Sequence, residues 1–168
     1  MSSAHLHLML NHVPVIGAVF GILLLGIAVL RRSDEIGKVA LGLFGLLGAV
    51  SVVVFLTGEP AEDLVEKLPG FSETITEQHE EVALVATIAM AGLGALALAA
   101  LVAFRRRALP RWVISAGLAA SVAVGALMGY TAYLGGQVRH TEVRPGATAV
   151  LQVEGTVAEG DDRERGAR

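Results

Sequence analysis

The sequence predicts an all-α membrane protein: a bundle of four transmembrane helices followed by a short polar tail. The composition is the first observation, because 54% of the 168 residues are hydrophobic and only 17% are charged. Soluble domains carry roughly 25% charged residues. The second observation is a set of four long apolar runs, and the third is the gathering of basic residues in two of the links between them.

Each apolar run is free of Asp, Glu, Lys, Arg and His, and the runs cover residues 13–30, 39–56, 82–104 and 112–134. A helix needs about 20 residues to cross the hydrocarbon core of a bilayer. Spanning segments must satisfy their backbone groups internally, which favours helices. Buried helices of a soluble protein are the alternative, but four such runs leave no amphipathic faces to meet water. With their polar flanks, the runs predict helices at about 5–30, 37–56, 74–104 and 111–134, in a membrane domain of residues 1–140.

Basic residues predict the orientation of the helices. The first and third links contain seven of them: Arg31, Arg32, Lys38, Arg105, Arg106, Arg107 and Arg111. The long second link contains only Lys67, and the N-terminal segment has none. Because positively charged links stay in the cytoplasm, both termini and the long link are expected outside. The sequence thus predicts a multi-pass protein of the bacterial inner membrane, with both termini periplasmic or extracellular.

The long outer link is acidic and is expected to contain a short helix. Pro60 suits the first turn of such a helix, and Pro69-Gly70 would end it. The next helix is expected to begin near Thr74, where a capping-box pattern ends at Glu77. Gly135-Gly136 is expected to end the fourth helix. The polar periplasmic tail, residues 141–168, is expected to form a strand over 141–153 and to be flexible over 155–168.

Small residues predict close packing between helices. Gly117, Ser121, Gly125 and Gly129 repeat every four residues on the fourth helix, and Gly17 and Gly21 form a GxxxG pattern on the first. Small side chains allow helix backbones to approach closely in a membrane. We expect this seam to join helices of one chain, and a homodimer seam is the alternative.

The predicted topology places all five histidines at the outer helix ends. His12 and His79 lie nearest the membrane boundary, and His5, His7 and His140 lie farther out. If the first helix is continuous, His5 and His12 share a face, because seven residues are close to two turns, and His7 points the other way. Pro14 leaves a second interpretation open, in which the helix begins near His12.

Histidines from two helices can hold a haem iron inside a bundle. The chain has no Cys, which excludes covalent c-type attachment and predicts haem b. The first expected ligand pair is His12 with His79, and the second is His140 with His5 or His7, with Arg139 beside the haem propionates. The alternative is a copper or zinc site built from His12, His79, His140 and His5, with carboxylates as extra ligands: Glu59, Glu80 or Glu142. A third interpretation gives the histidines only structural hydrogen bonds at the interface.

Four blocks of sequence resemble the signature blocks of a family of small bacterial four-helix membrane proteins of unknown function. They are HLHLMLNHVP at 5–14, TGEPAE at 57–62, His79-Glu80 and GGQVRH at 135–140. The resemblance covers about residues 4–142. It implies a four-helix fold with histidines at the outer helix ends, a setting in respiratory or redox membranes, and haem binding.

The expected function is that of a b-type cytochrome-like electron-transfer subunit rather than a stand-alone enzyme. Its expected partners are the lipid bilayer, quinol, and a periplasmic electron carrier or a larger respiratory complex, without nucleic acid. The absence of charged residues from the apolar runs argues against a proton pump or an ion channel. A structural or assembly subunit without cofactor and a periplasm-facing metal-binding protein are the two alternatives.

Overall fold

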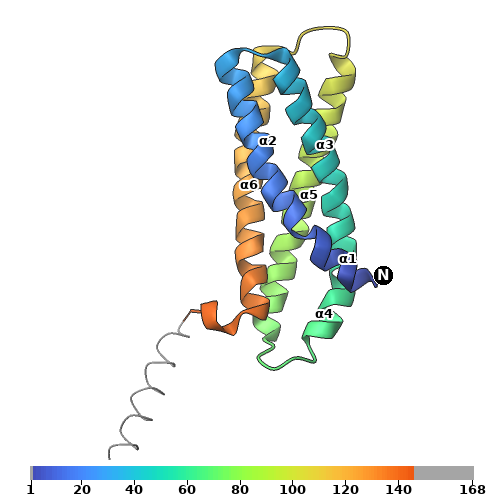
Figure 1. The fold of residues 1–168 in the computed structure, drawn as a ribbon, viewed down its shortest axis with the longest axis vertical. Helices are drawn as coiled ribbons and strands as arrows, with labels where there is room; N and C mark the ends of the chain where they lie inside the picture. Colours follow the sequence, from blue (N-terminus) through green and yellow to red (C-terminus); the bar gives the residue numbers. More distant parts are fainter. Residues whose placement is uncertain (1, 146–168) are drawn as a thin grey trace, which may run out of the picture.

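Four long helices run antiparallel to one another in the computed structural model, which describes residues 2–145 (Figure 1). They are α2 (His12–Arg31), α3 (Asp34–Leu56), α5 (Glu73–Ala103) and α6 (Arg111–Arg139). Helices α2 and α5 each pack against both α3 and α6. Four helical stretches, the first of which joins α1 to α2, are long and apolar enough to cross a membrane. The predicted all-α, multi-pass fold is therefore confirmed, and no strand occurs between residues 2 and 145.

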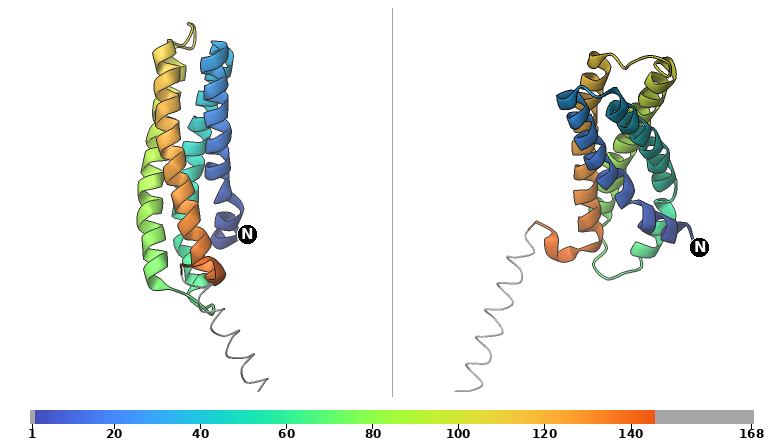
Figure 2. Two further views of the ribbon diagram at one scale, coloured as in Figure 1. Left: turned by 90° about the vertical axis from the view of Figure 1, so that its left-hand side faces the viewer. Right: turned by 45° about the horizontal axis from the view of Figure 1, so that its top comes forward.

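The first predicted helix is divided into α1 (Ser3–Leu10) and α2 at Asn11. Pro14 causes the division, because it has no N–H to donate to the carbonyl of Leu10. Asn11 keeps helical backbone angles and its N–H donates to the carbonyl of His7, but α1 turns away from the axis of α2 (Figures 1 and 2). The two interpretations of Pro14 are thus both partly realised. Helix α1 lies across the end of α3 and packs on the short helix α4 (Glu59–Val65) (Figures 1 and 2).

Helix α6 does not end at Gly135-Gly136, where the sequence predicts a stop, but continues to Arg139. Leu134 and Gln137 are both buried and hold this last turn against the bundle. The Arg144 guanidinium then donates to the carbonyls of Gln137 and Val138, at 2.8 and 3.1 Å, and satisfies carbonyls that a helix end leaves free.

Residues Thr141–Val143 form a 3-10 helix, η1, in place of the start of the predicted strand. The remainder of that strand and the flexible segment predicted at 155–168 lie outside the described residues.

The two short links meet at the end of the bundle opposite α1 and α4. The Asp34 carboxylate accepts a hydrogen bond of 2.5 Å from the N–H of Leu109 and forms an ion pair of 2.7 Å with Lys38. The Lys38 ammonium also donates to the carbonyl of Arg107 at 2.9 Å. These three bonds, hereafter the link-to-link bonds, fix the α5–α6 link on the first turn of α3. Helix α3 accordingly begins at Asp34, three residues before the start predicted from hydrophobicity, with the Ser33 side chain as its cap.

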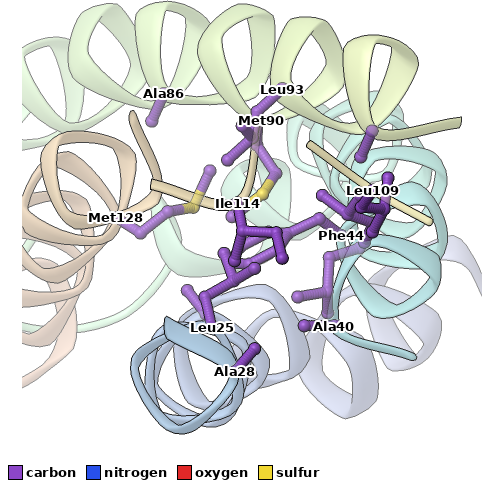
Figure 3. Packing of buried hydrophobic residues seen from close by; sticks show 14 residues of the cluster. Leu25, Ala28, Ala40, Phe44, Ala86, Met90, Leu93, Leu109, Ile114 and Met128 are labelled. Atoms are coloured by element: carbon purple, nitrogen blue, oxygen red, sulfur yellow. The ribbon is translucent and has the colours of Figure 1, made fainter. Parts of the chain in front are cut away.

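Apolar side chains from all four long helices fill the centre of the bundle (Figure 3). Phe44, Leu25, Leu47 and Met90 are almost wholly buried. The predicted GxxxG residues of α2 receive side chains of α3: Gly21 faces the ring of Phe44 and Gly17 faces Leu47. The pattern therefore packs within one chain, by seating large side chains over glycines.

The closest approach of two backbones is between α3 and α5. A methyl group on Gly94 would lie 2.8 Å from the carbonyl oxygen of Phe44 and 3.2 Å from the Cα of Gly48. The predicted small-residue stripe of α6 contributes less. Ser121 is buried and a methyl group on Gly125 would meet the tip of Ile22, but nothing lies within 4 Å of such a group on Gly129. The α3–α5 seam is thus the tighter one.

Candidate functional site

All five histidines lie at one end of the bundle, which we call the histidine end. It is formed by α1, α4, the first turns of α2 and α5, the last turns of α6, and η1 (Figure 1). His5 and His7 belong to α1, His12 begins α2, His79 lies in the second turn of α5, and His140 follows α6. Residues far apart in the sequence are thereby brought to the same end of the bundle.

Two of these side chains, His7 and His79, turn toward neighbouring helices and are half-buried. Nδ1 of His7 lies 2.9 Å from the carbonyl oxygen of Val54 on α3. Nδ1 of His79 lies 3.1 Å from the carbonyl oxygen of Thr131 on α6. A carbonyl oxygen only accepts, so in both rings Nδ1–H is the donor. Nε2 of each neutral imidazole then carries a lone pair, which is the form that binds a metal.

Each of the two inward rings lies against a glycine. A methyl group on Gly135 of α6 would lie 2.9 Å from Cε1 of His79, and one on Gly58, just before α4, would lie 3.8 Å from Cε1 of His7. Gly135 therefore leaves space for an imidazole. This contact accounts for a glycine inside α6, which the sequence pattern alone attributes to a helix end.

The inward rings and two carboxyl groups form one polar cluster. His7 and His79 are close enough for a charge on either ring to act on the other, and Glu80 acts on His79 in the same way. The Glu80 carboxyl lies close enough to the carboxyl of Glu62 on α4 to act on its titration. The interaction with Glu80, partial desolvation and the nearby negative charges together raise the pKa of Glu62 to about 7. The two carboxyls are consequently placed side by side most favourably when Glu62 is protonated.

The other three histidines are exposed and bond to their own neighbours in the sequence. Nδ1 of His5 lies 2.7 Å from the Ser2 hydroxyl, and Nδ1 of His140 lies 2.9 Å from a Glu142 carboxylate oxygen. The ring of His12 bonds to the Asn11 amide oxygen at 2.5 Å. Within residues 2–145, none of these three rings forms a hydrogen bond with His79 or His7.

His12 borders an apolar groove of about 310 Å³ between α2 and α3, together with Ile16, Phe20 and Leu46. His79 instead faces α6. The two residues expected as the first ligand pair therefore point toward different helices. The expectation that His5 rather than His7 shares the functional face depends on a continuous first helix, and the division at Asn11 removes that premise.

Two histidines of the histidine end, His7 and His79, turn inward. Within residues 2–145, no group of three or more His, Asp or Glu side chains is placed to hold a metal ion. Zinc and copper sites normally take three or four side chains, whereas a haem iron takes two axial ligands. The exposed Arg139 closes α6 at this end and supplies a cation.

No family model, no curated protein and no solved structure matches this chain.

Proposed function

We propose that this protein is a b-type cytochrome-like electron-transfer subunit whose haem is held by His7 and His79 at the histidine end. The state of the two rings is the observation that supports this function. Each donates Nδ1–H to a backbone carbonyl and makes no hydrogen bond through Nε2 within the described chain. Metal-ligating histidines characteristically hold their second ring nitrogen in this way, which fixes the tautomer and the ring orientation.

Several groups of the chain would contribute to such a site. The carbonyls of Val54 and Thr131 orient the two imidazoles, and Gly58 and Gly135 give the rings room. The guanidinium of Arg139, in the last turn of α6, would attract the propionate carboxylates of a bound haem. With no Cys in the chain, such a haem would be held without covalent attachment. A bound haem would supply one-electron redox chemistry, which no side chain of this cluster supplies alone.

One haem per chain is proposed, because the second expected ligand pair lacks an inward orientation. His140 and His5 are exposed and already bond to Glu142 and Ser2. We further propose that the histidine end faces the periplasm of a bacterial inner membrane, since the opposite end carries the arginine-rich links. Quinol on one side and a periplasmic carrier or a larger respiratory complex on the other would then be its redox partners.

The visible spectrum of the purified protein, made with adequate haem supply, tests this function. A Soret band that shifts on reduction, with about one haem per chain by pyridine haemochrome, is expected. A colourless protein with stoichiometric copper or zinc would favour the metal-binding alternative. A protein with neither would favour a structural or assembly subunit.

Three variants test the ligand assignment. His7→Ala and His79→Ala should each remove most of the haem, because each deletes a side chain that would bind its iron. His5→Ala is the matched control on the exposed face of α1 and should retain it. All three proteins must accumulate in the membrane at the wild-type level. If His7→Ala and His79→Ala both bind haem normally, the ligand assignment is wrong even where the haem itself is present.

A further inference from the structure

The end of the bundle opposite the histidines gathers arginine side chains from both short links. These residues, which we call the arginine end, are Arg31, Arg32, Arg105, Arg106, Arg107 and Arg111. All six are exposed, and within the described residues none of their guanidinium groups forms a salt bridge or a hydrogen bond. Two acidic residues lie nearby. Asp34 already binds Lys38 and the N–H of Leu109, so Glu35 is the acidic residue that remains to offset the arginine charges.

The link-to-link bonds fix these arginines as one surface. Asp34 and Lys38, at the start of α3, hold the N–H of Leu109 and the carbonyl of Arg107. The α5–α6 link with its three consecutive arginines is therefore anchored next to the α2–α3 turn (Figure 1). The arginine charges of the two links are therefore held next to each other on one surface.

Arg32 occupies a backbone position that favours glycine. Its φ of 54° makes it the one non-glycine residue with a positive φ in the described chain. Its N–H closes α2 by bonding to the carbonyls of Ala28 and Val29, which a glycine would do equally well without strain. The turn thus does not require an arginine, and the Arg32 side chain is exposed. A role for the guanidinium outside the fold accounts for its presence at a strained position.

We propose that the arginine end is a binding surface for the anionic headgroups of phospholipids, with Arg32 as one of its main contacts. Charge complementarity supports this ligand, because a guanidinium fork matches the oxygens of a phosphate. Depth supports it too, because the six residues border the apolar spans and so lie at the level of the headgroups. Neither argument depends on a haem.

The test is a thermal-unfolding titration of the full-length protein in a neutral detergent. Added phosphatidylglycerol should raise the Tm more than added phosphatidylcholine does, and high salt should weaken the effect. Native mass spectrometry counts the bound phosphatidylglycerol. In Arg32→Gly, the Tm without lipid should be equal or higher, while the apparent affinity for phosphatidylglycerol falls about fivefold, the usual value of one basic residue at an anionic surface. The double variant Arg105→Gln with Arg106→Gln should lower the apparent affinity for phosphatidylglycerol further.

Lys67→Gln is the matched control, because it removes an exposed positive charge from the opposite end. It should leave the response to phosphatidylglycerol unchanged. Equal Tm shifts from the two lipids would overturn the proposal, as would an unchanged response in the arginine variants. If phosphatidylglycerol does not change the Tm but an acidic peptide raises it, the surface binds a protein partner. That result would also overturn the proposal.

Discussion

The imidazole of His79 lies so close to Gly135 that one added methyl group would sit 2.9 Å from its Cε1 atom. These residues belong to α5 and α6, and the ring bonds to the carbonyl of Thr131, four residues before that glycine. The side chain at position 135 therefore determines whether the ring can keep its place. The adjacent Gly136 has nothing within 4 Å of its own Cβ position.

This pair of glycines provides a matched experiment on the site. Gly135→Ala should displace the His79 ring and lower the haem content severalfold. Gly136→Ala places the same methyl group in open space and should stabilise α6 by up to about 1 kcal/mol. Haem per protein and the Tm in detergent are the two measurements. Equal haem content in the two variants would show that Gly135 does not position His79.

The α3–α5 seam predicts a second contrast between glycines. Gly94→Ala should lower the free energy of unfolding by about 1–3 kcal/mol, because its methyl group would meet the backbone of α3. Gly92→Ala is the control, since its methyl group would meet nothing within 4 Å. Unfolding in mixed detergent measures both. A Gly94→Ala protein as stable as Gly92→Ala would contradict the close approach of α3 and α5.

The raised pKa of Glu62, with Glu80 beside it, predicts that α4 detaches from α5 as the pH rises. The pKa of Glu62 is raised from 4.5 to about 7 in the folded protein. A raised pKa means that the carboxyl stabilises the docked state fully below about pH 4.5 and loses this contribution as the pH rises through about 7. Because the chain has no Cys, spin labels at Leu64→Cys and Gln78→Cys report the α4–α5 distance without background labelling. We expect the distance distribution to broaden between pH 5 and pH 8, a range chosen to bracket that pKa.

The control for this experiment is Glu62→Gln, whose amide can donate to the Glu80 carboxylate at any pH. Its distance distribution should not depend on pH over that range. A wild-type pH response that persists in Glu62→Gln would assign the titration to another group.

The orientation of the bundle is open to direct labelling. Single cysteines replacing Glu66 and Arg106 lie at opposite ends and are both exposed. We expect a membrane-impermeant maleimide added to intact cells to label position 66 but not position 106, because basic links remain in the cytoplasm. Labelling of position 106 alone would invert the topology and place the histidines in the cytoplasm.

The helices of this fold were predictable from sequence because each depends on a local property. A run without charged residues, long enough to cross a bilayer, can satisfy its backbone only as a helix. The ends of the helices were less predictable, since they depend on partners far away in the chain. The start of α3 at Asp34 depends on Leu109, and the passage of α6 through Gly135 is accompanied by the contact with His79.

The inward orientation of His7 could not be read from helical periodicity. Periodicity places His5 and His12 on one face only when the helix between them is unbroken. Pro14 divides it, and the packing of α1 on α3 and α4 then selects which ring turns inward. Glu62 was overlooked as a site residue for a related reason, because its role arises from Glu80 on another helix. The short spacing of Gly45 and Gly48 was the available signal for the α3–α5 seam.

The bond between Asp34 and Leu109 joins residues 75 positions apart. It connects two hairpins, α2–α3 and α5–α6, whose internal contacts are local and can form as soon as each hairpin has entered the bilayer. The bond itself can form only after the second hairpin has been synthesised and inserted. The bond therefore acts on the association of the hairpins rather than on their insertion. Without the Asp34 carboxylate, both hairpins should still reach the membrane, and the loss should be in their packing against each other.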